Sequence, residues 1–416
     1  MQVFKFGGAS VKDAEGVRNF LLTLRTIGAK EVLIVVSAMG KMTNAFEKIV
    51  NIYFDNRDDV AQKLEEVKEF HVAVLQNLKF QKDHAVYKEV DAVFAELIEF
   101  IRRNNSTDYD YCYDQIVSKA ELLSSKICHV YLMENSIDNK WLDVRKCIKT
   151  NSDFRRAKVD WDTTCKLINA EVDKSGITIT QGFLGSDNYG RTTTLGREGS
   201  DYTAGIFAYC LDAVEVSIFK DVQGVLNADP REFESTELIE KMSYKEAIEM
   251  AFYGASVIHP KTLQPLQRKE IPLKVRSFLD TDLAGTLISS GADITPAIPC
   301  FVVKKEQILI SVSDREFNFV MEEDISEIFS FLHKFKMKVN LIQNSALSFS
   351  VCVENNFNNF KELLKALQPK YKVKYNKGLT LYTIRHFQES DIKGIEVGRE
   401  VLLKQRSRDT VQVIVK

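Results

Sequence analysis

The sequence predicts an α/β fold, a mainly parallel sheet sandwiched by helices, followed by a smaller α+β region. Short β-branched apolar runs alternate with helical patterns from residue 1 to about residue 280, which is typical of parallel strands joined by helices. Beyond the turn "SSGADITPAIPC" the order becomes strand, helix, strand, strand and helix over residues 300–367. That order is typical of a ferredoxin-like module.

The first strand and helix enclose a pair of glycines. Ser10 and Asp13 follow the first apolar run and resemble a capping box ahead of the helical stretch "GVRNFLLTLRTI". Gly7 and Gly8 therefore lie between the carboxyl end of a strand and the amino end of a helix, where open α/β sheets bind ligands. The predicted strands of this region are residues 3–6, 31–36, 176–183, 214–219 and 272–278.

Long amphipathic stretches predict that residues 55–135 are mainly helical. The change of pattern places a domain boundary near residues 290–300, so we expect one domain over 1–295 and another over 300–416. Two late runs, "LTLYTI" and "TVQVIV", could complete the ferredoxin-like module and begin a second one.

Composition excludes several classes of protein. A net charge of -2 over 416 residues offers no electrostatic reason to expect nucleic acid or an anionic membrane as a partner. The seven cysteines are scattered and odd in number, which favours reduced thiols over a disulfide framework or a zinc site. Apolar runs such as "VLIVV" are too short to cross a bilayer, and the first strand begins almost at Met1. We therefore expect a cytoplasmic protein without a signal peptide.

The stretch "KFGGAS" has the chemistry of a phosphate site. Glycines allow backbone N–H groups to approach an oxyanion, and the following helix amino terminus favours negative charge. Lys5 would add a mobile positive charge beside Gly7 and Gly8. Taken alone, the stretch is better explained as a solvent-exposed lysine beside a structural turn.

The densest polar stretch is "QGFLGSDNYGRTTTLGREGSDYTA". Its glycines precede a predicted helix, and Arg197 offers a planar fork that suits a carboxylate. A glycine-rich hairpin with Ser200 as an ordinary helix cap explains the turn, but it does not explain the whole run of hydroxyls and charges around Asp201.

Three further stretches are weak signals by themselves. "VVSAMGKMTN", "FKDVQGVLNADPR" and "FYGASVIHPKTLQPL" are each compatible with an ordinary loop, and His259 is compatible with a structural hydrogen bond. The sequence contains no HExxH, nucleophile elbow or GxGxxG, so the common zinc-protease, hydrolase and Rossmann signatures are missing.

In this order and spacing, "KFGGAS", "TTTLGREGSDYTA", "KDVQGVLNADPR" and "GASVIHPKTL" resemble the motifs of the aspartate kinases, a branch of the amino-acid kinase family. The resemblance covers residues 1 to about 290. It implies an amino-acid kinase fold for the first domain. The region 300–416 resembles the ACT modules that accompany such domains, with one near-complete unit and a shortened second one.

The resemblance implies transfer of the γ-phosphoryl group of ATP to the side-chain carboxylate of L-aspartate, with Mg²⁺. The product would be 4-phospho-L-aspartate, the first intermediate toward lysine, threonine and methionine. A carboxylate with a reference pKa of ~3.9 is already ionised at neutral pH and needs no general base. The reaction instead needs alignment of the acceptor and control of repulsion between two anions, which Lys5 and the amides of Gly7 and Gly8 would provide.

The resemblance also implies a role for each matching position. Glu121 in "SKAELLSS" would pair with the substrate ammonium, and Arg197 with the α-carboxylate, although a solvated helix carboxylate is the plain alternative for Glu121. Ser37, Thr43, Ser200 and Asp201 would complete the acceptor site and orient Lys5, while Lys220, Asp221 and Arg231 match the nucleotide segment. Many relatives carry lysine where this chain has Ser256, and Lys261 could replace it.

Two other functions remain open. The fold could serve another acceptor, glutamate or acetylglutamate, or the chain could be a catalytically silent ACT sensor. The "GREGSDYTA" and "HPKTL" stretches argue against the first, and the intact set of Lys5, Glu121, Arg197 and Asp201 argues against the second.

ACT modules of such kinases pair and bind an end-product amino acid, so the resemblance implies feedback by lysine or threonine and a homodimer through residues 300–416. The segment "DREFNFVMEEDISEIF" carries several carboxylates and no glycine, which favours lysine, acting weakly.

Overall fold

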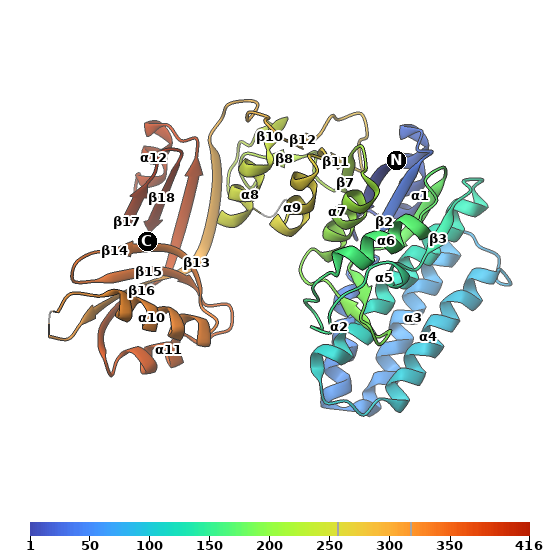
Figure 1. Cartoon of the computed structure of the whole chain (residues 1–416), viewed down its shortest axis with the longest axis horizontal. Helices are drawn as coiled ribbons and strands as arrows, with labels where there is room; N and C mark the ends of the chain where they lie inside the picture. The colour runs from blue at the N-terminus through green and yellow to red at the C-terminus, as the bar shows by residue number, and fades with distance from the viewer. Residues whose placement is uncertain (256–257, 317) are drawn as a thin grey trace. The chain divides into compact units, whose positions relative to one another are not determined.

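The structure, a computed structural model, describes residues 1–255, 258–316 and 318–416 (Figure 1). The chain divides into two compact units. The first holds the described residues of 1–225, 238–248 and 256–295, and the second those of 226–237, 249–255 and 296–416. The chain therefore passes between the two units several times before residue 296.

The first unit is built on an eight-stranded sheet with the order β10-β12-β11-β7-β1-β2-β4-β3. Neighbouring strands are parallel except for the antiparallel pair β11–β12. The five predicted strands are confirmed as β1 (Gln2–Phe6), β2 (Val32–Val36), β4 (Ile177–Gln181), β7 (Val216–Lys220) and β11 (Leu273–Ser277). The sequence patterns missed the short strands β3 (Lys140–Leu142), β10 (Lys241–Ser243) and β12 (Thr286–Ser289).

The first helix, α1 (Ala14–Ile27), begins one residue after Asp13, whose carboxylate accepts the Gly16 N–H at 2.9 Å. Asp13 is thus the cap itself, and the predicted pairing of Ser10 with Asp13 in a capping box is wrong. The Ser10 hydroxyl instead donates to the Phe219 carbonyl, because the loop after β1 lies against β7.

The predicted helical region is confirmed, and in Figure 1 the helices α3 and α4 run side by side. Helix α5 is buried along most of its 26 residues, because it packs between the sheet and other helices. The helices of this region are α2 (Met42–Asp55), η1 (Arg57–Asp59), α3 (Val60–Asn77), α4 (Ala85–Arg103) and α5 (Tyr109–Glu134). Later elements are η2 (Val144–Lys146), α6 (Trp161–Glu171), β5 (Leu184–Ser186), β6 (Thr192–Thr194), α7 (Gly199–Leu211), β8 (Val225–Leu226), β9 (Leu238–Ile239), α8 (Tyr244–Tyr253) and α9 (Pro260–Arg268).

The second unit contains a six-stranded antiparallel sheet with the order β14-β15-β13-β16-β18-β17. The predicted order of strand, helix, strand, strand and helix is confirmed, whereas α12 and β17 were missed. The elements are β13 (Cys300–Asp314), α10 (Glu322–Lys334), β14 (Lys338–Asn344), β15 (Phe349–Glu354), α11 (Phe360–Leu367), β16 (Tyr371–Arg385), α12 (Glu389–Glu396), β17 (Val401–Arg406) and β18 (Thr410–Val415).

Two long strands, β13 and β16, each serve two ferredoxin-like halves. Their register shifts near Gln307, where the ladder is interrupted by a bulge. The later half of β13 belongs with α10, β14, β15 and α11, whereas its first half lies beside the part of β16 that pairs with β18. The second ferredoxin-like half is formed by the end of β16 with α12, β17 and β18, and the first residues of β13 serve as its fourth strand.

The expectation that all cysteines are reduced is wrong for one pair. Cys165 on α6 and Cys210 on α7 form a disulfide with their Cα atoms 4.8 Å apart. They are 45 residues apart in sequence, so only the packing of α6 on α7 brings them together. The five cysteines outside this disulfide are buried. In the part of the chain that the structure describes, no helix is both long and apolar enough to cross a membrane.

Candidate active site

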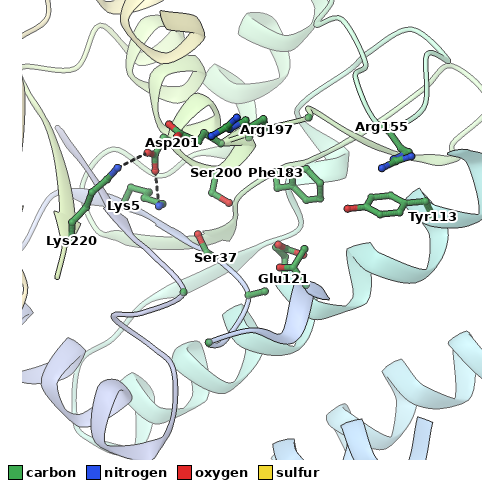
Figure 2. Close-up of a pocket in the computed structure, with 17 residues that line it drawn as sticks. Lys5, Ser37, Tyr113, Glu121, Arg155, Phe183, Arg197, Ser200, Asp201 and Lys220 are labelled. Carbon is green, nitrogen blue, oxygen red and sulfur yellow. Dashed lines mark ion pairs between the residues drawn. The ribbon is translucent and has the colours of Figure 1, made fainter. Parts of the chain in front are cut away.

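A cavity of about 500 Å³ opens at the carboxyl ends of the central strands of the first unit (Figure 2). Lys5 comes from the end of β1, Ser37 directly follows β2, and Lys220 ends β7. Nine of the predicted site residues line it: Lys5, Gly8, Ser37, Thr43, Glu121, Arg197, Ser200, Asp201 and Lys220.

Two lysines bind one buried carboxylate at one end of the cavity. Lys5 Nζ lies 2.5 Å from Asp201 Oδ1, and Lys220 Nζ lies 3.5 Å from Asp201 Oδ2, as the dashed lines of Figure 2 show. Burial by itself would raise the pKa of Asp201, but the two ammonium groups outweigh it and lower that pKa. Asp201 is therefore ionised at neutral pH, and it holds Lys5 at the cavity wall.

Of the two glycines after β1, Gly8 makes room for this arrangement. A Cβ on Gly8 would lie 2.8 Å from the Ala38 carbonyl oxygen and 3.0 Å from that of Gly40, so only glycine lets the loops after β1 and β2 meet. Gly7 does not line the cavity, but a Cβ there would lie 3.4 Å from Lys5 Nζ. This is an ordinary contact distance, so the position of Lys5 does not by itself require glycine at residue 7.

Glu121 projects into the cavity from the middle of α5 and is almost wholly buried. Burial raises its pKa to about 8, despite hydrogen bonds that involve the Ala38 backbone and the Thr43 side chain. Among the described residues, its Oε2 atom has no hydrogen-bond partner. A buried carboxyl oxygen without a partner at a cavity wall is suited to bind a cation.

The amino end of α7 forms a third side of the cavity. A Cβ on Gly182 would lie 2.4 Å from the Ser200 Cβ, so glycine after β4 lets this helix start approach the sheet closely. Arg197 lies exposed at the rim, with Ser200 deeper in the cavity (Figure 2). Glu198, between them in the chain, also lines the cavity and adopts a left-handed backbone with φ of 53°.

Four residues of the cavity wall with large side chains were not predicted as site residues: Tyr113, Arg155, Phe183 and Glu198. Phe183 and Glu198 lie within the polar stretch of residues 181–204, whereas Tyr113 and Arg155 are in stretches without any local signal. In Figure 2 Tyr113 and Arg155 lie beyond Phe183, away from Lys5. The two ends of the cavity therefore differ: one carries the lysine pair and the other an arginine stacked on a tyrosine, 4.4 Å from the ring centre.

A buried carboxylate holds Arg155 in place. Arg155 has a left-handed backbone with φ of 65°, and its N–H donates to Asp114 Oδ2 at 3.0 Å. Asp114 also accepts the N–H and the hydroxyl of Thr194, at 2.8 and 2.7 Å. Burial raises the pKa of Asp114 to about 6. Asp114 thus ties α5 to β6 and to the Arg155 loop.

Three predicted nucleotide residues do not line the cavity. Asp221 is exposed after β7, and Lys261 is exposed in the first turn of α9. Arg231 belongs to the second unit, where it pairs with Asp229 at 2.6 Å. His259 caps α9 by accepting the Lys261 N–H at 3.1 Å, which confirms the structural interpretation of that histidine. Ser256 lies outside the described residues.

Comparison with known proteins identifies relatives over most of the chain. The sequence model of the Amino acid kinase family matches residues 1–277. Lysine-sensitive aspartokinase 3 of Escherichia coli (strain K12) is 30% identical over 410 residues, which cover 96% of this chain and 89% of that protein. Aspartokinase 1, chloroplastic, of Arabidopsis thaliana is 29% identical over 85% of this chain and 63% of its own length.

Solved structures agree with these matches. The crystal structure of E. coli aspartokinase III in complex with lysine and aspartate superposes with a TM-score of 0.83 at 27% identity, over 100% of this chain and 96% of that one. The same enzyme in complex with aspartate and ADP gives a TM-score of 0.81 over the same shares of the two chains. These two structures contain both units of the fold described above.

Proposed function

The chain belongs to the amino acid kinase family, and on that premise we propose that it is an aspartate kinase, which transfers the γ-phosphoryl group of ATP to the side-chain carboxylate of L-aspartate. The main support for the proposal is that one cavity contains both the Lys5–Asp201–Lys220 cluster and the carboxyl of Glu121, whose Oε2 has no hydrogen-bond partner among the described residues. The first suits a phosphoryl group and the second an ammonium group.

The deciding experiment is hydroxylamine trapping of the acyl phosphate with ATP and three acceptors in parallel. We expect product with L-aspartate and little with glutamate or N-acetylglutamate. A preference for either of the latter would assign the fold to another acceptor, and no product with any acceptor would support a silent sensor.

The acceptor site would hold L-aspartate by its three charged groups. Glu121 would bind the ammonium and Arg197 the α-carboxylate, with hydroxyls of Ser37, Thr43 and Ser200 completing the site. The side-chain carboxylate would then face the lysine end of the cavity. It is ionised at neutral pH, since its reference pKa is ~3.9, so the step needs orientation and not proton removal.

Lys5 would stabilise the charge of the transferring phosphoryl group, helped by the backbone around Gly8, while Asp201 keeps the lysine oriented. Bound Mg²⁺ would neutralise phosphate charge on the donor. The orphaned Oε2 of Glu198 is a suitable oxygen ligand for such a cation, so the residues present fit the group. The described residues contain no cluster of three or more His, Cys, Asp or Glu side chains that could bind a metal by itself.

The raised pKa of Glu121 predicts a pH-dependent affinity for aspartate. In the empty site the carboxyl is mostly protonated below pH 8, yet it must be ionised to pair with the ammonium. Binding therefore releases a proton, and the aspartate KM should fall by up to about tenfold per pH unit between pH 6 and pH 8, then level off. KM measured at saturating ATP checks this. A Glu121→Gln variant should show high KM without that slope, and a flat wild-type profile would contradict the prediction.

We propose that Lys220, Asp221, Arg231 and Lys261 serve the nucleotide. Of these, Lys220 lines the cavity, and Lys261 is on the same unit at the exposed start of α9. Lys261→Ala should raise the ATP KM severalfold, because a positive charge is lost, and Ser256→Lys in that background should partly restore it. An ATP KM unchanged in Lys261→Ala would show that the nucleotide site works without this lysine.

We further propose a catalytic domain over residues 1–295 and an ACT regulatory region over 300–416, in a cytoplasmic homodimer paired through that region. The relative's name, lysine-sensitive aspartokinase 3, supports lysine as effector. In this chain, however, the carboxylates of Asp324 and Glu327 on α10 already bind Lys370 Nζ, at 3.3 and 2.5 Å. An internal lysine thus neutralises part of the acidic surface that would attract the effector.

Inhibition by lysine should accordingly be weak, with coupling at the low end of the usual range of about 1–3 kcal/mol, or roughly fivefold in affinity. Separate titrations of lysine and threonine into the kinase assay test this. Strong inhibition by threonine alone would reverse the assignment. Insensitivity to both would leave the region a role in holding the dimer together.

A further inference from the structure

Glu198 is a charged residue in a backbone conformation that favours glycine. Its φ of 53° and ψ of 30° lie in the left-handed region, which a residue with a Cβ adopts at an energetic cost. The neighbouring positions, Gly196 and Gly199, are glycines already. A third glycine would form the turn more easily, so the turn itself does not explain a glutamate here.

The carboxyl of Glu198 is also incompletely satisfied. Its Oε2 is buried at the cavity wall and has no hydrogen-bond partner among the residues that the structure describes. The next carboxylate, Asp201, is different, because it already binds the ammonium groups of Lys5 and Lys220. At the amino end of α7 the cavity therefore contains one paired carboxylate, Asp201, and, three residues before it, one with an oxygen still available for a cation.

The Oε2 atom of Glu198 lies at the wall of the cavity that also contains Lys5 and Lys220, the lysines that would bind nucleotide phosphates. Lys5, Lys220, Arg197 and Asp201 line the same cavity as Glu198. A polyanionic phosphate chain that approaches these lysines would be repelled by Glu198, unless a cation lay between them. Magnesium in phosphate-transferring sites is typically held by one or two carboxylates together with substrate phosphates.

We propose that Glu198 is an oxygen ligand for the divalent cation that accompanies the nucleotide. The inference rests on the proposed nucleotide-dependent function and adds a residue to it. Glu198 would hold the cation through its buried Oε2, and the cation would supply positive charge that offsets the repulsion between this carboxylate and the phosphates. The competing occupant is the ammonium group of the acceptor, for which Glu121 is the better placed carboxyl because it is almost wholly buried in α5.

Calorimetric titration with ADP tests the proposal without turnover. ADP is titrated into the full-length wild type, Glu198→Gln and Glu198→Gly, each with Mg²⁺ and with EDTA. The wild type should bind ADP more tightly with Mg²⁺. In both variants that preference should fall by about tenfold or more, as for the loss of groups that support a metal site. Metal-free ADP should bind the variants as well as the wild type or better, because a repulsive charge is gone.

The chain offers a matched control at the other end of the same helix. Asp212 also has a left-handed backbone, with φ of 50°, and pairs with Lys269 on the surface, outside the cavity. Asp212→Gly removes an acidic side chain from the same kind of backbone, so the magnesium preference should stay at the wild-type value. Glu198→Gly should fold, since glycine relieves the backbone conformation, and a thermal melt of each variant checks this.

The outcomes separate this inference from the function on which it rests. An unchanged magnesium preference in both Glu198 variants would overturn the inference, as would an effect confined to aspartate binding, which would assign Glu198 to the ammonium. Failure of the wild type to bind ADP with or without Mg²⁺ would overturn the proposed function and the inference with it. Electron paramagnetic resonance of Mn²⁺ with ADP supplies a second readout, in which Glu198→Gln should leave less Mn²⁺ bound.

Discussion

Lys5→Ala is expected to reduce kcat by about 10²–10³-fold, the usual effect of removing one positioned partner of transition-state charge. Lys5 is buried at the cavity wall and held 2.5 Å from Asp201 Oδ1, so its ammonium group is oriented before substrate binds. The loss should appear in single-turnover measurements of phosphoryl transfer, with the aspartate KM changed much less. A variant within a few-fold of the wild-type kcat would end the assignment of Lys5 to catalysis.

A second variant separates this catalytic effect from a loss of stability. When Lys5 is removed, the buried Asp201 keeps its ion pair with Lys220 at 3.5 Å but loses the shorter of its two ion pairs. A buried charge that is only partly neutralised is destabilising. In the double variant Lys5→Ala/Asp201→Asn both the lysine and the charge it neutralised are removed. We expect its melting temperature to recover toward the wild type while kcat stays low. Recovery of kcat together with stability would mean that Lys5 is only structural.

Substitution of Glu121 or Arg197 by alanine is expected to raise the aspartate KM by roughly 10- to 100-fold and to leave the ATP KM nearly unchanged. A charge-assisted contact contributes about 1.5–3 kcal/mol, which corresponds to roughly 10- to 100-fold in affinity. Glu121 should show the larger effect, because it is almost wholly buried whereas Arg197 lies exposed at the rim. Solvent competes with the ligand for an exposed guanidinium.

The most informative substitution at this position is Glu121→Gln. With a pKa of about 8, the empty site holds Glu121 mostly in its protonated form at neutral pH, and glutamine resembles that form in size and charge. The variant should therefore fold normally and still lose aspartate affinity. Arg197→Lys is the conservative partner and should retain more affinity than Arg197→Ala. If Glu121→Gln weakens ATP binding and leaves aspartate binding intact, the acceptor site has been placed at the wrong end of the cavity.

Local physics in the sequence determined most of the elements of the fold. The five apolar runs became strands because β-branched residues favour extended backbone. Gly8 was recognisable as a glycine between a strand and a helix, where backbone N–H groups can approach an oxyanion, but the close approach of the two loops was visible only in the structure. The polar residues at the carboxyl ends of β1, β2 and β7 could be expected to meet, since parallel strands present their carboxyl ends at one edge of a sheet.

The tertiary structure alone decided which distant residues share the cavity, how deeply each is buried and how each is ionised. Asp201 reaches Lys5 because α7 packs on the sheet beside β1, and the pKa of Glu121 follows from burial in α5, which no local pattern encodes. The stacking of Arg155 on Tyr113 and the disulfide between Cys165 and Cys210 likewise depend on contacts between elements far apart in the chain. Local sequence sets the conformational preference of each segment, whereas the sheet order and helix packing set the distances between side chains, and those distances control charge, burial and chemistry.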